Sequence, residues 1–300
     1  MKVKSSLNHL KKYKNTYWAL GLSPRGIDGV RQGEIQWITD PAGHDRRWFA
    51  DPFILKHDDR EVDVLVEEYE YATMRGHLSH IVIDRQKGEV TKSTPILQLA
   101  THLSFPVIYR MNGKVIVAPE NYQSGGYTAY EYDLANERLI PIKQIAQGKF
   151  TDTIIRQFGT KYYLFSTLEP NANGSVLEIY EADDFFGPYA HFQTVTFDER
   201  IARNGGDFYP YEGQLVRPAQ YNDDGYGRGL SLQAITFDGR FSFREIARIF
   251  SPNEQLNLGF HTYNEYEGLG IVDAKGWYAP VFGKSYDAFY RLLKKTGLRK

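Results

Sequence analysis

Charged and amide side chains recur inside short strand-like segments of this 300-residue chain, where apolar residues are the usual occupants. The first is Asp51, which lies between Phe49 and Phe53 in the stretch RRWFADPFIL. Burial raises the pKa of a carboxyl group and a nearby cation lowers it, so such a position suits proton transfer to or from a substrate. Comparable segments further along carry His102 with Ser104, Asp152, Arg217 with Gln220, and His261.

The spacing of these segments indicates a repeated structural unit. Anchors at Asp51, Phe105, Asp152, Arg217 and His261 are separated by 54, 47, 65 and 44 residues, close to the length of a four-stranded propeller blade. Most anchors begin a strand–turn–strand pattern, as at the Asn-Gly turn of residues 112–113. Inner strands of five blades would bring acid, base and hydrogen-bond donors to one axis, where they could bind the hydroxyl groups of a sugar.

The composition favours β-structure. The chain has 22 tyrosines, 18 phenylalanines and 4 tryptophans, residues that fit a pleated, half-buried surface, and helical periodicity is scarce before the last residues. We therefore predict an all-β fold, a single five-bladed β-propeller domain over residues 1–300 with a short C-terminal helix. The blades are expected to begin near residues 48, 103, 150, 213 and 259, residues 15–40 to complete the last blade, and residues 285–300 to form the helix.

Charge and composition exclude several classes of function. The net charge is −1, with 36 basic and 37 acidic residues, so no overall field would attract nucleic acid. Cysteine is absent, which excludes disulfides, thiolate metal sites and a cysteine nucleophile. No segment has the ~18 apolar residues of a membrane span and the start lacks a signal-peptide pattern, so a cytoplasmic protein without a membrane span is expected.

The C-terminal segment differs from the rest because its apolar residues follow a helical period. Tyr286, Phe289, Leu292 and Leu293 share one face of a helix, and basic residues occupy the others. This basic amphipathic helix is expected to pack on its own domain or to contact a protein partner or a membrane surface.

Six segments together resemble a known family: WFADPFIL, LVEEY, HLSFPVIYRMNGKVIVAPE, TDTIIR, YYLFSTL and RPAQ. They resemble the five-bladed propeller at the N-terminus of plant glucosamine inositolphosphorylceramide transferases and of related stand-alone bacterial proteins. More distantly, the layout is similar to glycoside hydrolase family 43. The resemblance covers about Trp48 to Asn264.

The resemblance to family 43 implies roles for individual residues. It implies that Asp51 is a general base and that Asp152 orients the catalytic acid and adjusts its pKa. The acid would be a glutamate entering blade four, where Glu212 is only loosely aligned, so Glu68 and Glu120 are rival candidates.

The remaining candidates are expected to bind substrate rather than to transfer protons. They are Trp48, His102, Arg217, Gln220 and His261. No cofactor is expected, and no metal either, because no ligand motif is present in sequence; His102, Asp51 and Glu120 could hold Ca²⁺ or Zn²⁺ only if the fold brought them together.

Three functions are compatible with these features. The leading hypothesis is a carbohydrate-active propeller of the glycoside hydrolase type, with a glycan or glycoside in its axial pocket. The alternative is a non-hydrolytic glycan-binding or accessory domain in the biosynthesis of cell-surface polysaccharide or glycolipid, and the third is a propeller for protein contacts alone. Each polar residue also has a structural interpretation, since Asp51 before Pro52 could open a strand and Arg217 could join two blades.

Overall fold

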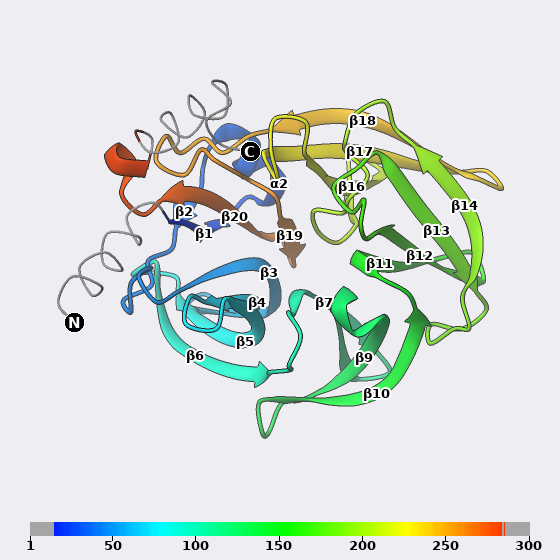
Figure 1. The fold of residues 1–300 in the computed structure, drawn as a ribbon, viewed down its shortest axis with the longest axis horizontal. Helices are drawn as coiled ribbons and strands as arrows, with labels where there is room; N and C mark the ends of the chain where they lie inside the picture. The colour runs from blue at the N-terminus through cyan, green and yellow to red at the C-terminus, as the bar shows by residue number, and fades with distance from the viewer. Residues whose placement is uncertain (1–14, 284, 286–300) are drawn as a thin grey trace, which may run out of the picture.

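Five four-stranded antiparallel sheets are arranged around a central axis (Figure 1). The structure is a computed structural model that describes residues 15–283 and 285. In each sheet one edge strand lies beside the axis and the other edge strand lies at the rim, so each sheet is one blade of a propeller. The predicted fold class, an all-β five-bladed propeller, is confirmed.

Blades one to four are each built from four strands that are consecutive in the chain, and the blades follow one another around the ring. Blade one contains β3 (Arg47–His57), β4 (Glu61–Glu70), β5 (Arg75–Asp84) and β6 (Glu89–Leu97). Blade two contains β7 (Ser104–Met111), β8 (Lys114–Glu120), β9 (Gly126–Asp133) and β10 (Arg138–Gln147), with the short 3₁₀ helix η2 (Tyr122–Ser124) between β8 and β9. Blade three contains β11 (Phe150–Phe158), β12 (Lys161–Leu168), β13 (Val176–Ala182) and β14 (Ala190–Thr196). Blade four contains β15 (Tyr209–Tyr211), β16 (Gln214–Tyr221), β17 (Gly229–Phe237) and β18 (Phe241–Ile249).

Blade five joins segments from both ends of the described chain. From the axis outward it contains β19 (Tyr263–Tyr266), β20 (Leu269–Trp277), β1 (Thr16–Ser23) and β2 (Gln36–Trp37), and helix α2 (Gly26–Gln32) connects β1 to β2. Strand β1 pairs with β20 over eight residue pairs, from Thr16 opposite Trp277 to Ser23 opposite Gly270. This pairing completes blade five and so closes the ring between blade four and blade one.

The innermost strands share one irregularity near the axis. Register shifts follow Ala50, Ser104 and Thr151 in β3, β7 and β11, and the next residues, Asp51, Phe105 and Asp152, have φ values of 49, 47 and 43°. Non-glycine residues rarely adopt positive φ, and bulges of this kind reorient side chains beside active sites. The bulges therefore place Asp51 and Asp152 at equivalent points of two blades.

Blade four departs from the predicted layout. The segment around Arg217 was expected to be its innermost strand, but it forms β16, the second strand, while β15 has three residues. The axial part of the blade is the irregular segment 201–206, joined to β16 by an isolated bridge between Asn204 and Ala219. The error has a physical source, because Gly205 and Gly206 break the strand pattern that sequence analysis relies on.

The chain beyond blade five contains a helical turn at residues 280–283. The predicted amphipathic helix over residues 285–300 falls outside the described residues, apart from Ser285. Within residues 15–283 and 285, no helix is long and apolar enough to cross a membrane.

The contact between the axial segment of blade four and β19 generates a testable prediction. Gly206 has a φ of 143°, and a Cβ there would collide with the carbonyl oxygen of Tyr263. Gly206→Ala is expected to lower the free energy of unfolding by at least about 3 kcal/mol, from backbone strain together with overpacking. Urea denaturation measures this loss.

Gly213→Ala is the matched control. Gly213 also has a positive φ, of 76°, but open space surrounds the position of its missing Cβ. Its replacement is expected to cost only the strain of about 1–2 kcal/mol. Equal losses in the two variants would contradict the close approach of blade four to blade five.

Candidate functional site

The second strand of each blade presents one polar side chain opposite the axial irregularity. In blades one to three the register pairs are Ala50 with Glu67, Ser104 with Glu120, and Thr151 with Thr167. In blades four and five, the N–H groups of Gln220 and Asp273 donate to the carbonyl oxygens of Arg203 and Thr262. All five second-strand side chains are buried, and they recur at steps of 53, 47, 53 and 53 residues: Glu67, Glu120, Thr167, Gln220 and Asp273.

Asp273 of β20 holds blade five against blade one. Its carboxylate accepts the backbone N–H of Asp51 at 2.9 Å, and those of His261 at 3.3 Å and Thr262 at 3.0 Å. It also lies 2.7 Å from Nδ1 of His261. Burial lowers the pKa of His261, but the charges of Asp273 and Asp51 outweigh it and leave the pKa above its ordinary value.

Asp51 is oriented by neighbours from two other blades. Its Oδ2 accepts the backbone N–H of Phe105 at 3.2 Å, its Oδ1 accepts the hydroxyl of Thr262 at 2.9 Å, and Nε2 of His261 lies 3.7 Å from Oδ1. Burial raises the pKa of Asp51 to about 6, with His261 acting in the opposite direction. The carboxylate is therefore ionised at neutral pH and takes up a proton slightly below it.

Arg203 joins the acids of blades two and three. Its Nε donates to Oδ2 of Asp152 at 2.6 Å and its Nη2 to Oε2 of Glu120 at 3.0 Å. Gln220 donates from Nε2 to the same Asp152 oxygen at 2.6 Å, and the backbone N–H of Asp152 donates to Glu120 at 2.9 Å. Burial raises the pKa of Glu120 well above its ordinary value although the charge of Arg203 opposes the shift. Asp152 and Glu120 are thus held in one network around a buried guanidinium.

Glu67 is the axial acid with the least cationic support. It is 6% exposed, and burial together with the charges of Asp51, Glu120 and Asp152 raises its pKa well above the ordinary value. Its Oε1 lies 3.4 Å from Nε2 of His102. Space for this carboxyl exists because residue 76 is glycine, whose Cβ would lie 2.5 Å from Oε1. Glu67 therefore holds its proton more tightly than an ordinary glutamate does.

His102 faces Glu67 in its neutral form. Burial, assisted by the charge of Arg203, lowers the pKa of His102. Its Nδ1 accepts the backbone N–H of Gly76 at 2.9 Å, so the ring proton is on Nε2, which faces Glu67.

Aromatic rings and unpaired acceptors lie beside the axial acids. Tyr226 is 40% exposed, and its ring centroid is 5.7 Å from the guanidinium carbon of Arg203. The ring of Tyr226 also makes an edge-to-face contact with His261. His261 in turn stacks on Trp18, with 3.8 Å between the ring centroids. Oε1 of Gln220 and Oδ1 of Asn121 are buried without a hydrogen-bond partner. Unpaired buried acceptors are costly, and the hydroxyl groups of a ligand or water molecules could satisfy both.

The structure brings six of the ten predicted site residues to the axis. They are Asp51, Asp152, Glu120, His102, Gln220 and His261. The grouping of Asp51, His102 and Glu120 as metal ligands is not found; His261 and Asp273 lie beside Asp51 instead, with one potential ligand atom of each within 4.8 Å of the others.

Two predicted acids lie elsewhere. Glu68 faces away from the axis, since it is adjacent to Glu67 in β4 and side chains alternate along a strand; its carboxylate accepts hydrogen bonds from Arg47 and Ser93 at 2.9 Å each. Glu212 lies in the exposed turn between β15 and β16, at the opposite end of β16 from Gln220.

Two residues that were predicted to bind substrate, Arg217 and Trp48, instead pack against other parts of the protein. Arg217 is fully buried inside blade four, where it donates to Asn204 at 2.7 Å, to Gln233 at 2.5 Å and to the carbonyl of Ala202, and burial lowers its pKa to about 9. It positions the segment that carries Arg203. Trp48 stacks on Tyr69 at 4.6 Å, and Tyr69 neighbours His102, so Trp48 belongs to the wall beside the site.

Sequence reasoning missed Glu67, Asp273, Arg203, Tyr226 and Trp18. The 53-residue step between Glu67 and Glu120, repeated between Gln220 and Asp273, could have identified two of them. Arg203 offered no signal, because it lies in a segment without a strand pattern.

The raised pKa values of three acids and of His261 predict how the stability of the protein depends on pH. Asp51, Glu67, Glu120 and His261 all bind protons more tightly in the folded protein than their ordinary pKa values imply. Stabilisation is then present at low pH and lost as pH rises through the folded pKa values. The free energy of unfolding is expected to fall between about pH 5 and pH 8, by ~1.4 kcal/mol per pH unit for each proton of difference.

Urea denaturation across this range tests the expectation. Glu67→Gln should make the decline shallower, because it removes one group with a raised pKa, and Glu212→Gln in the exposed turn should leave it unchanged. A wild-type stability that is flat or rises over this range would contradict the burial of ionisable acids at the axis.

Comparisons with known proteins agree with this architecture. Residues 10–268 match the family described as "Glucosamine inositolphosphorylceramide transferase 1, N-terminal". Glucosamine inositolphosphorylceramide transferase 1 of Oryza sativa subsp. japonica is 25% identical over 308 residues, covering 89% of this chain and 40% of the rice protein. The protein of the same name from Arabidopsis thaliana is 26% identical over 236 residues, covering 74% of this chain and 30% of its own length. The chain thus spans less than half of the curated relatives it matches.

Solved structures show the same fold at low sequence identity. An exo-β-1,3-galactanase of Phanerochaete chrysosporium has a TM-score of 0.52 at 10% identity, covering 67% of this chain and 49% of its own. The catalytic domain of an α-L-arabinofuranosidase of glycoside hydrolase family 62 from Coprinopsis cinerea has a TM-score of 0.50 at 12% identity, covering 75% and 90%. With its family matched over most of its length, the chain belongs to the glucosamine inositolphosphorylceramide transferase 1 N-terminal family, a carbohydrate-related propeller family.

Proposed function

We propose that this propeller binds a glycosyl group at its axis and cleaves a glycosidic bond, with Glu67 as the general acid and Asp51 as the general base. The observation that carries the proposal is the separation of proton affinities between two neighbouring axial carboxyls. Burial and the neighbouring acids raise the pKa of Glu67 well above its ordinary value, whereas Asp51, with a pKa of about 6, is ionised at neutral pH. Such pairs assign acid and base in glycoside hydrolysis.

The reaction needs one proton to be given and one to be taken. Glu67 would donate its proton to the leaving oxygen as the glycosidic bond breaks. Asp51 would take a proton from the water that attacks the anomeric carbon. After the reaction Glu67 would be ionised and Asp51 protonated. His261 and Thr262 hold the Asp51 carboxylate from behind, and His102 contacts Glu67.

Binding of the sugar would use the groups that remain unpaired. The acceptors of Gln220 and Asn121 suit sugar hydroxyl donors, and the exposed ring of Tyr226 offers a platform for the apolar face of a pyranose. The fold gives further support to a sugar ligand, since two solved structures with similar folds are named as a galactanase and an arabinofuranosidase.

Turnover of a panel of aryl glycosides and oligosaccharides tests the proposal. Glu67→Gln and Asp51→Asn are each expected to lower kcat by at least about 100-fold, the usual contribution of a positioned acid or base. Glu212→Gln is the control, because this exposed turn residue lies away from the axis, and it should keep wild-type activity. Wild-type kcat should also decline below about pH 6, as Asp51 becomes protonated. Unchanged turnover in the Glu67 and Asp51 variants would refute the acid–base assignment.

A second function is favoured by one specific observation. The axial segment of blade four, residues 201–206, contains no glutamate. It contains Arg203, which pairs with Glu120 and Asp152. This arrangement supports glycan binding without cleavage, as an accessory domain in the biosynthesis of a cell-surface polysaccharide or glycolipid. The curated relatives are named as transferases, and this propeller accounts for 40% of the rice protein.

A glycan array followed by calorimetry separates the two functions. Binding without product formation, together with loss of binding in Arg203→Gln, would establish the second function over the first. Product formation that depends on Glu67 would establish the first.

A further inference from the structure

Blade one carries a second cluster of titratable side chains, on the face of β4 opposite Glu67. Glu68 and Glu70 are two residues apart and so point to the same side of the strand. His77 of β5 is the register partner of Glu68, so it lies on the same face. One potential ligand atom of each of these three residues lies within 4.8 Å of the others.

His77 is the unusual member of the cluster. It is 7% exposed, and its Nε2 is buried without a hydrogen-bond partner. The nearest carboxylate oxygen, Oε2 of Glu68, lies 3.8 Å away, which is too far for a hydrogen bond. Ser79, two residues along β5 and therefore on the same face, has a buried hydroxyl that is also unpartnered. Leaving such groups unpaired costs free energy, and a bound ion with its water would satisfy them.

The carboxylate of Glu68 is fixed by neighbours that leave it able to bind an ion. Arg47 donates to its Oε1 and Ser93 to its Oε2, both at 2.9 Å. Arg47 also forms an ion pair with Asp40, whose Oδ2 lies 3.0 Å from its Nε. Its single positive charge is therefore divided between two carboxylates and does not fully neutralise Glu68. A carboxylate has about four lone-pair directions, and outer contacts of this kind orient metal ligands.

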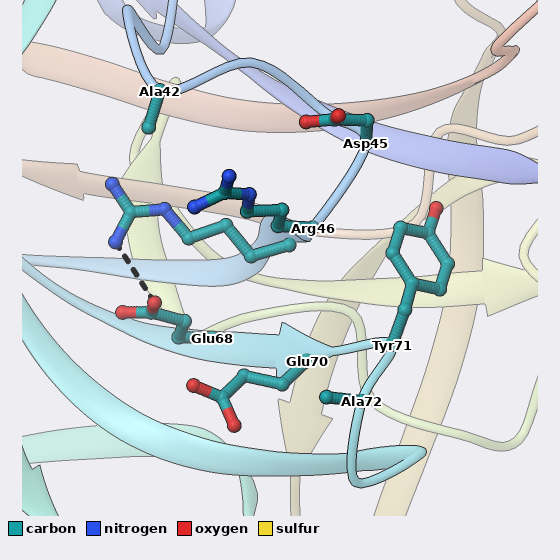
Figure 2. A pocket seen from close by; sticks show the side chains of 8 residues that line it. Ala42, Asp45, Arg46, Glu68, Glu70, Tyr71 and Ala72 are labelled. Carbon is teal, nitrogen blue, oxygen red and sulfur yellow. Dashed lines mark hydrogen bonds and ion pairs between the residues drawn. The ribbon is translucent and has the colours of Figure 1, made fainter.

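Solvent reaches the cluster through two cavities. One, of about 630 Å³, is lined by Asp45, Arg46, Arg47, Glu68, Glu70 and Tyr71, and Figure 2 shows Glu68 and Glu70 among the side chains that line it. The other, of about 180 Å³, is lined by Glu70 and His77 among others. Glu70 belongs to both cavities, so an ion held by the three residues would be accessible from outside.

We propose that Glu68, Glu70 and His77 form a binding site for a divalent transition-metal ion of the zinc type. Imidazole nitrogen favours such ions over Ca²⁺ or Mg²⁺, and zinc accepts mixed histidine and carboxylate ligands. Three protein ligands leave at least one coordination position open toward the cavities. The site is separate from the axis, because Glu67 and Glu68 point to opposite faces of blade one.

Isothermal titration of chelator-treated protein with Zn²⁺ tests the site. Wild-type protein is expected to bind one equivalent there, and His77→Gln and Glu70→Gln should each weaken that binding by at least about tenfold, the minimum seen even for outer contacts of metal ligands. Co²⁺ serves as a second probe, since its absorption bands should be lost in the same two variants. Circular dichroism confirms that each variant is folded.

Two matched controls locate the ion. His261→Gln removes the histidine of the axial group formed with Asp51 and Asp273, and His191→Gln removes an exposed histidine beside Glu178. Both should retain the equivalent that His77→Gln loses. The proposal is overturned if folded wild-type protein binds no Zn²⁺, if His77→Gln binds it as wild type does, or if binding is lost only with His261.

Discussion

The pairing of β1 with β20 is the interaction on which the rest of the structure depends. Eight residue pairs join strands from opposite ends of the described chain, and without them blade five would have two strands and two open edges. Closure forces the five axial segments to face one another at short range. It also gives Asp273, in the strand next to β1, its position behind the axis, where it accepts the N–H groups of Asp51 and Thr262 and so joins the last blade to the first.

Convergence of the blades concentrates buried acidic side chains around the axis. Five buried acids face the axis, namely Asp51, Glu67, Glu120, Asp152 and Asp273. Arg203 compensates two of them, and His261 lies between two others. Glu67 is left with a neutral histidine as its neighbour, and burial without a nearby cation raises its pKa. The chemical asymmetry of the axis therefore follows from where the few cations are placed, more than from the number of acids.

Sequence reasoning reached the fold because aromatic-rich strands and turn signals repeat at blade length, which local patterns record well. It reached Asp51 and Asp152 because each interrupts an apolar strand. It chose Glu68 over Glu67, since two adjacent glutamates look alike in sequence and only the register with Ala50 and Phe49 decides which one faces the axis. Arg203 could not be found, because its segment has no strand pattern of its own. The segment is held at the axis by tertiary contacts, namely the bond from Arg203 to Asp152 and the bridge between Asn204 and β16.

The two adjacent glutamates of β4 show how one strand can serve two sites. Glu67 and Tyr69 face blade two and the axis, where Gly76 leaves room for the carboxyl. Glu68 and Glu70 lie on the other face, which also carries His77, and both line the cavity of about 630 Å³ (Figure 2). Because the period of a strand is two residues, side chains on these two faces share a backbone but point in opposite directions. A substitution on one face can therefore change its chemistry while the strand continues to hold the other face. Single-residue variants can for this reason separate the axial site from the cluster of Glu68, Glu70 and His77.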